Sequence, residues 1–299
     1  MGRPKIPIPK EELHQLYVEQ EMSPKDIAKR YHCHRQTVIN RLREYDIPVR
    51  SKAAGTALAK IKHPKADFSG DPIEKAYLIG LRQGDLDVRL VNPGGRTIRI
   101  ECASTRPEQI ELIKGLFEPY GHIVLCGPYQ RGRMSIQCLL NLSFDFLLPK
   151  RDYIDDWILA DDCCFAAFLA GYTDAEGCIG ISGGKAYFIL ASSDKTTILQ
   201  IYDKLSAMGI AAPAPKLWLP KGQRREYQGH EIVTRKDIWR LGIYRKASLL
   251  QLFDLLDPYL KHAKRRRDVA RARANIEMRN SRLANRRLAS KATGLAHHP

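Results

Sequence analysis

The sequence has no hydrophobic run long enough to cross a membrane. Its longest apolar stretch, residues 163–172, is about half of the roughly 20 residues that a membrane-spanning helix needs. The N-terminal residues MGRPKIPIPK contain no apolar segment of the kind that signal peptides carry. These two absences predict a protein without a membrane-spanning segment or a signal peptide, located in the cytoplasm or in an organellar matrix.

Disulfide and zinc-site patterns are also missing. The seven cysteines form no CxxC pair, and their odd number does not fit a complete disulfide framework. We therefore expect a reducing compartment and neither disulfides nor a structural zinc site. The cysteines are Cys33, Cys102, Cys126, Cys138, Cys163, Cys164 and Cys178.

Acidic residues are scarce relative to basic ones. The chain has 33 Asp and Glu against 49 Lys and Arg, which gives a net charge of +16. Net charge does not determine a fold, but it favours a polyanionic partner, with nucleic acid first and an anionic membrane surface second. With 299 residues, of which 44% are hydrophobic, the chain can form one large or two to three small domains.

Residues 1–47 are expected to form a small all-α domain. Apolar periodicity predicts helices over residues 11–20 and 35–45, and between them a helix begins at Pro24 with Ser23 as its cap. This order is similar to that of helix-turn-helix domains, whose later helix enters the major groove of DNA. A structural or protein-binding bundle is the alternative. The last helix carries polar residues suited to DNA, namely Arg35, Gln36, Thr37, Asn40 and Arg41.

The rest of the chain divides into a linker, two similar halves and a tail. Residues 48–70 form a basic linker interrupted by proline and glycine. Residues 71–160 and 161–260 each show the order helix, two strands, helix, two strands, helix, with the last strand expected over residues 233–243. Residues 261–299 contain a basic helix. The fold class is α+β, a pseudo-twofold pair of αββαββα halves preceded by the small all-α domain.

Two short stretches reveal the duplication. The stretch LIGLRQGD ends at Asp85, and the stretch LAGYTDAE ends at Glu176, 91 positions later. Both are small-residue apolar helices that end in one carboxylate, which indicates a repeated half. Small residues such as Gly80 and Gly171 allow two helices to cross closely, so the two helix ends would bring Asp85 and Glu176 together.

Two neighbouring carboxylates indicate a metal site. Like charges are costly at short distance without a cation, and oxygen ligands that leave room for water and phosphate suit Mg²⁺. A metal-bound water can attack a phosphodiester. The alternative is a pair of helix-terminal acids that form salt bridges at a domain interface.

These motifs resemble the LAGLIDADG homing endonuclease family in its two-repeat, single-chain form. The stretch LAGYTDAEG matches the nine-residue family motif at most positions, and LIGLRQGDL matches at the small positions and the acid. Gln83 stands where an acid is common, and Leu86 where glycine is usual. The resemblance covers about residues 71–270, and an added helix-turn-helix domain also occurs in such enzymes.

The resemblance implies a site-specific endonuclease that cuts both strands of DNA across one minor groove. It implies a divalent cofactor, Mg²⁺ or Mn²⁺, held by Asp85 and Glu176, and hydrolysis that leaves 5′-phosphate and 3′-hydroxyl ends. A basic residue near the end of each half assists the reaction in this family. Lys150 and Lys264 occupy these places, with Lys261 as a rival to Lys264. An ordinary phosphate contact is the alternative for these lysines.

The strands are expected to supply a DNA-recognition surface. If helices cover one face of each sheet, the alternate residues of every strand point to the other face and are polar. The two polar faces can then form a saddle over the major groove. A long asymmetric target and a monomeric protein follow from the single-chain form. Any single residue on this face could also be an ordinary solvated one. The candidates are Arg89, Arg99, Arg133, Gln137, Lys216, Arg235 and Arg240.

Two other functions remain open. The chain could be a catalytically inactive transcriptional regulator of the same fold, although such proteins would be expected to lose the carboxylates. It could also be an intron-splicing maturase, since the basic surface suits RNA. Its ends lack the residues that protein splicing uses, so an intron-encoded or free-standing enzyme is expected rather than an intein.

Overall fold

The computed structural model describes residues 7–51, 54, 64–227 and 230–294. The chain forms two compact units, Met1–Pro64 and Lys65–Pro299, which we describe separately. None of the helices in the described residues combines the length and the apolar character that a membrane span requires.

The first unit is the predicted three-helix domain. Helix α1 spans Lys10–His14 and continues as one π-helical turn over Gln15–Glu19, and α2 (Pro24–Arg30) and α3 (Arg35–Glu44) follow. The Ser23 hydroxyl accepts a hydrogen bond from the Asp26 backbone N–H at 3.2 Å, as expected of the predicted cap. The helices enclose one apolar core, which includes Leu13, Leu16, Ile27, Val38 and Leu42.

Arg50 fastens the chain that leaves this unit. Its guanidinium group donates hydrogen bonds to the backbone carbonyls of Tyr17 and Met22, at 2.8 and 2.7 Å, and lies 3.9 Å from the centre of the Tyr17 ring. The start of the predicted linker therefore belongs to the helical domain.

The end of the predicted linker packs on the second unit. The Lys65 ammonium donates to Thr97 Oγ1 at 2.6 Å, and the Phe68 N–H donates to Ser143 Oγ at 2.8 Å. The segment between the two units is thus shorter than the predicted 48–70. Its basic residues Lys52, Lys60 and Lys62 lie outside the described residues.

The first half begins with helix α5 (Pro72–Gly84) and contains one four-stranded antiparallel sheet in the order β1-β2-β4-β3. Strands β1 and β2 form a hairpin, helix α6 crosses the sheet, and β3 and β4 form a second hairpin that ends in a 3-10 helix. The bounds are β1 Asp87–Leu90, β2 Ile98–Ser104, α6 Pro107–Phe117, β3 His122–Cys126, β4 Met134–Leu140 and the 3-10 helix Leu142–Leu147.

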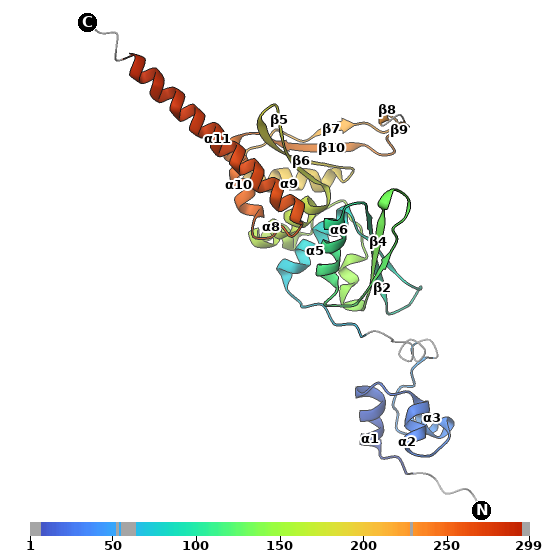
Figure 1. Cartoon of the computed structure of the whole chain (residues 1–299). Helices are drawn as coiled ribbons and strands as arrows, with labels where there is room; N and C mark the ends of the chain where they lie inside the picture. Colours follow the sequence, from blue (N-terminus) through green and yellow to red (C-terminus); the bar gives the residue numbers. More distant parts are fainter. Residues whose placement is uncertain (1–6, 52–53, 55–63, 228–229, 295–299) are drawn as a thin grey trace, which may run out of the picture. The chain divides into compact units, whose positions relative to one another are not determined.

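The second half repeats this order (Figure 1). A short helix that the sequence did not predict, α7 (Asp156–Ala160), leads into α8 (Asp162–Glu176). The sheet order β5-β6-β10-β7 matches that of the first half, so the α+β class is confirmed. The bounds are β5 Gly177–Ser182, β6 Lys185–Ser192, α9 Lys195–Ala207, β7 Lys216–Leu219, β10 Ile238–Ile243 and α10 Lys246–Leu256.

A two-stranded ribbon interrupts the second half. The strand predicted over residues 233–243 is wrong, because it is two strands in different sheets, β9 (His230–Val233) and β10. Strand β9 pairs with β8 (Arg224–Tyr227), and the chain turns between them and β10. The Asp237 carboxylate accepts a hydrogen bond from the Lys221 N–H at 2.7 Å and so closes the base of the ribbon.

The tail forms the long helix α11 (Ala263–Gly294), as predicted. Val269, Ala272 and Ile276 are buried and join the core shared by both halves. Among the described side chains beyond Ile276 none is buried, and Figure 1 shows the helix running on past the second sheet. Packing thus explains the first part of this helix only.

Candidate active site between the two halves

Helices α5 and α8 cross at two glycines. A Cβ atom built at Gly80 would lie 2.1 Å from the Phe168 carbonyl oxygen, and one built at Gly171 would lie 2.1 Å from the Tyr77 carbonyl oxygen. Any side chain at these positions would force the helices apart. Further along, a Cβ atom on Gly84 would lie 2.3 Å from Ala175 Cβ, so the two C-terminal ends are also in contact.

The two helices end differently. Helix α8 runs through Glu176, and Gly177 begins β5 at once. Helix α5 stops at Gly84, Asp85 is its C-terminal cap, and β1 begins only at Asp87. Leu86, which occupies the usual glycine position, is buried in the core.

Asp85 is exposed to solvent and lines a pocket between the two halves. Gln109 Nε2 donates a hydrogen bond to Asp85 Oδ2 at 3.1 Å. Burial raises the pKa of the Asp85 carboxyl above its usual range, although Arg265, Lys150 and Arg106 act in the opposite direction. The carboxylate therefore sits among three positive charges.

Glu176 is half-buried and faces like charges. Burial is the main reason that its pKa is raised to about 7, the charges of Asp85 and Asp194 act in the same direction, and Lys150 and Arg265 act in the opposite one. The charge of Asp85 acts directly on Glu176, so the predicted meeting of the two helix ends is present in the structure.

This carboxylate pair suits a divalent cation. Within the described residues, no group of three or more His, Cys, Asp and Glu side chains is arranged to hold a metal ion. Mg²⁺, however, commonly takes only one or two carboxylates from a protein and fills its other positions with water and phosphate. A cation between Asp85 and Glu176 would offset the repulsion that raises the Glu176 pKa.

The structure separates the two predicted catalytic lysines. Lys150 is exposed, and its charge acts on Asp85, Glu176 and Asp194 alike. The Lys264 ammonium instead forms an ion pair with Asp268, one helical turn further along α11. The neighbouring Arg265 is the tail residue whose charge acts on both carboxylates. The catalytic role of Lys264 stays a prediction, and Arg265 is the better placed of the two.

Gln83 and Asp174 occupy equivalent positions in the two motifs, directly before Gly84 and Ala175. Each of them anchors a later segment of the chain by hydrogen bonds. Gln83 donates hydrogen bonds to the Arg151 and Tyr153 carbonyls at 3.1 and 3.0 Å. Asp174 Oδ2 accepts from the Tyr77 hydroxyl at 2.6 Å and from the backbone N–H groups of residues 261 and 262. These contacts fix the chain beside Lys150 and beside Arg265, a role that the sequence did not reveal.

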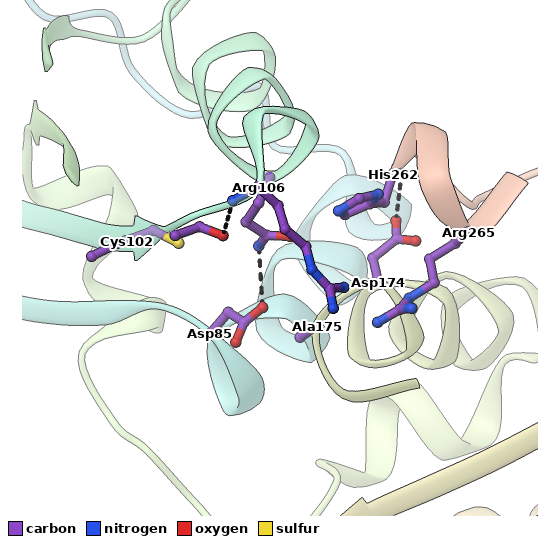
Figure 2. A pocket seen from close by; sticks show the side chains of 10 residues that line it. Asp85, Cys102, Arg106, Asp174, Ala175, His262 and Arg265 are labelled. Atoms are coloured by element: carbon purple, nitrogen blue, oxygen red, sulfur yellow. Dashed lines mark hydrogen bonds between the residues drawn. The ribbon is translucent and has the colours of Figure 1, made fainter. Parts of the chain in front are cut away.

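A pocket of about 230 Å³ opens beside Asp85 (Figure 2). Arg106 and Gln109 line it from the first half, His262 lines it from the residue before α11, and Arg265 lines it from the first turn of α11. In Figure 2 the Arg106 and Arg265 guanidinium groups point toward the space between Asp85 and Asp174. Sequence reasoning missed all four residues, because none belongs to the repeated motif.

The outward face of α3 holds most of the predicted helix-turn-helix contacts. Arg35, Gln36 and Asn40 are exposed, and Gln36 Nε2 donates to Asn40 Oδ1 at 3.1 Å. Thr37 is half-buried. The Arg41 side chain is only 14% exposed and forms an ion pair with Glu44. DNA contact by these five residues remains a prediction.

The predicted residues of the first sheet share its outer face. In the register, Arg89 lies opposite Arg99, and Glu101 lies opposite Gln137, while Ile98, Ile100 and Cys102 point into the core. Glu101 holds both arginines in ion pairs, at 3.6 and 3.5 Å. Arg133 is exposed immediately before β4.

The second sheet carries its predicted residues on the outer face and in a loop. Lys216 lies opposite Arg240 in the register. Arg240 donates to the Tyr244 hydroxyl at 3.0 Å, and its guanidinium lies 5.4 Å from the Trp218 ring centre. Arg235 is exposed in the loop between β9 and β10.

The Glu176 carboxyl is expected to make the metal-free protein less stable as pH rises. Its pKa is raised from 4.5 to about 7 in the folded protein, so between these values the unfolded chain releases the proton first and unfolding becomes easier. Urea unfolding in EDTA should show a smaller loss of stability between about pH 5 and about pH 7.5 in Glu176→Gln than in the wild type. Glu111→Gln, at an exposed position on α6, serves as the control. Equal slopes in all three proteins would contradict the assignment.

Residues 164–253 match the model of the LAGLIDADG-like domain family. No curated protein matches the chain. Among solved structures, the chain is similar to the homing endonuclease I-WcaI bound to its DNA recognition sequence, with 14% identity, coverage of 72% of this chain and 92% of that chain, and a TM-score of 0.46.

Two further structures are similar at the same level. I-DmoI in complex with DNA and Mn has 16% identity, coverage of 62% of this chain and 97% of that chain, and a TM-score of 0.42. The N-terminal LAGLIDADG domain of DUF199/WhiA has 12% identity, coverage of 62% and 84%, and a TM-score of 0.41. The family match runs from α8 to α10 and includes Glu176. The resemblance expected from the sequence is confirmed, because residues 164–253 match the LAGLIDADG-like domain family.

Proposed function

We propose that this protein is a site-specific double-strand DNA endonuclease of the homing type. The observation that carries the proposal is the pairing of Asp85 and Glu176 at the crossing of two equivalent helices, with Lys150 and Arg265 beside them. Two carboxylates and two cationic side chains close together, in a protein of net charge +16, suit the hydrolysis of a phosphodiester. The family match and the DNA-bound state of I-WcaI and I-DmoI support the same activity.

Asp85 and Glu176 are the proposed ligands of the metal. A divalent cation, Mg²⁺ or Mn²⁺, would supply positive charge to the reacting phosphate and a coordination position for water. The part of the protein is to hold two deprotonated carboxylates close together, and the positive charges of Lys150 and Arg265 favour that state of both acids. The same two side chains would attract and orient the phosphate. Products with 5′-phosphate and 3′-hydroxyl ends follow from the family resemblance.

The outer faces of the two sheets are the proposed recognition surface. Arg89, Arg99 and Gln137 in one half, and Lys216 and Arg240 in the other, present donors that can reach base edges and phosphates in the major groove. The exposed residues of α3 would contact DNA separately, and the basic face of α11 would add phosphate contacts. A long asymmetric target is expected because the two sheets carry different residues.

Cleavage of a plasmid library tests this proposal. Supercoiled plasmids that carry genomic or randomised inserts are incubated with the full-length protein in Mg²⁺ and in EDTA, and linear products are sequenced. We expect Mg²⁺-dependent linearisation at one long site and no cleavage in EDTA. Retention of one insert without cutting would contradict the nuclease and support a regulator. If the protein neither cuts nor retains any insert, the endonuclease proposal is contradicted, and binding of intron RNA, as for a maturase, is measured next.

A further inference from the structure

The turn from strand to helix is built in the same way in both halves but carries opposite charges. In the first half, the Arg106 backbone N–H donates to Ser104 Oγ at 3.0 Å, and Arg106 directly precedes α6. In the second half, the Asp194 N–H donates to Ser192 Oγ at 3.2 Å, and Asp194 directly precedes α9. Arg106 and Asp194 are therefore structurally equivalent, and one is a cation where the other is an anion.

A second equivalent pair lies one turn into each helix. Gln109 donates its hydrogen bond to Asp85. The corresponding residue, Thr197, is fully buried, and its hydroxyl has no hydrogen-bond partner within the described part of the chain. The Thr197 backbone N–H donates to the Asp152 carboxylate at 3.2 Å. Asp85 thus receives a side-chain hydrogen bond from α6, whereas the turn before α9 places another carboxylate, Asp194, near Glu176.

The pocket beside Asp85 is suited to an anion. Arg106 and Arg265 both line it, and the Asp174 carboxylate that also lines it already accepts three hydrogen bonds through one oxygen. His262 Nδ1 accepts a hydrogen bond from the Lys264 N–H at 3.1 Å, so a neutral His262 carries its proton on Nε2 and is a further donor. Its lining thus combines two cations and two neutral donors, Gln109 and His262, with the two carboxylates Asp85 and Asp174.

The surroundings of Glu176 are suited to a cation instead. Asp194 acts on Glu176 as a like charge, and Asp152 acts on Asp194 in the same way. Lys150 is the cation common to Glu176 and Asp194, and it is shared with Asp85. A phosphate that approaches Asp85 therefore meets the cation Arg106. A phosphate that approaches Glu176 meets the carboxylate of Asp194 at the equivalent position.

We propose that the pocket beside Asp85 binds the reacting phosphate of one DNA strand, and that this strand is cut before the other. The inference rests on the proposed endonuclease function and adds the order in which the two strands are cut. Negative charge accumulates on the phosphate in the transition state, and preorganised cationic donors stabilise that charge. Arg106 supplies such a donor to one strand only, and Asp194 opposes the same charge at the other strand.

The experiment follows both strands of one duplex. A target duplex with a different fluorophore on each strand is cut by the full-length protein in Mg²⁺ under single-turnover conditions, and the products are separated on denaturing gels. We expect the wild type to accumulate a duplex nicked always in the same strand, with the second cut slower by about tenfold or more. Equal rates for the two strands would overturn the inference and leave the nuclease intact. A wild type that cuts neither strand would overturn the proposed function, and this inference with it.

Two variants assign the order to the named residues. Arg106→Gln should slow the first cut by about 10²-fold and leave the second nearly unchanged, so that the preference is lost. Asp194→Asn should speed the second cut and shorten the life of the nicked duplex. Lys114→Gln removes one positive charge from α6, outside the pocket lining, and should change neither rate. Equal slowing of both cuts by Arg106→Gln, or a slower second cut in Asp194→Asn, would overturn the proposal.

Discussion

Asp85→Asn is expected to lower the single-turnover rate of DNA cleavage by about 10³-fold or more, because the substitution removes a proposed metal ligand. The amide keeps the size of the side chain and retains an oxygen that can accept the hydrogen bond from Gln109, so the fold should not change. The rate is measured on the target duplex in Mg²⁺ with excess enzyme. Glu176→Gln should have an effect of similar size.

Asp87→Asn provides the matched control. Asp87 lies two residues further along, is exposed, and forms an ion pair with Arg89 at 3.6 Å. A surface substitution of this kind should change the rate by no more than about twofold. Asp85→Asn also removes a charge that raises the Glu176 pKa, so the pH at which Glu176 ionises should fall. Cleavage by Asp85→Asn at the wild-type rate would show that the site has been placed wrongly.

Gly171→Ala, like Gly80→Ala at the equivalent position, is expected to cause a large loss of stability in the second unit. The new Cβ atom would lie 2.1 Å from the Tyr77 carbonyl oxygen and 3.0 Å from the Leu81 backbone nitrogen, and backbone atoms cannot rotate out of the way. Helices α5 and α8 would have to separate, which costs about 3 kcal/mol or more. Urea unfolding should show this as a lower midpoint with little change in slope.

Gly115→Ala tests whether the effect depends on the crossing. Gly115 lies within α6, and a Cβ atom built there meets no atom within 4 Å. Alanine is the better helix former, so this variant should gain about 0.5–1 kcal/mol. If both variants were destabilised to the same extent, close contact between α5 and α8 could not be the reason.

Periodicity and the repeated motif were sufficient to predict the αββαββα order of both halves. Glycines at positions 80 and 171 allow two helices to pack closely. Strands with alternating core residues, such as Ile98, Ile100 and Cys102, form a sheet with one buried face. The β8–β9 ribbon was not predicted, because residues 213–235 have no counterpart in the first half against which the pattern could be compared. Two short strands with cross-strand pairs such as Glu226 and Glu231 also lack an apolar face.

The carboxylates of the site could be predicted, but most of their neighbours could not. Asp85 and Glu176 end a recognisable motif, whereas Arg106, Gln109 and His262 reach the site only through tertiary packing. Lys264 and Arg265 are adjacent in the sequence, but only the charge of Arg265 acts on both carboxylates. Adjacent helical residues point about 100° apart, and the start of α11, which Asp174 fixes, decides which one faces the carboxylates. No spacing rule along the sequence contains that information.

The contact between the two crossing helices is still self-complementary, although the residues around it have diverged. Gly80 meets the carbonyl of Phe168, and Gly171 meets the carbonyl of Tyr77, so residue and partner exchange roles across a pseudo-twofold axis. This is the geometry of an isologous interface between identical subunits. The chain is thus organised as a fused homodimer, in which covalent linkage lets each former subunit change its site without a matching change in the other. Opposite charges at Arg106 and Asp194 are available only to such a fused pair, since a symmetric dimer would have to carry the same residue twice.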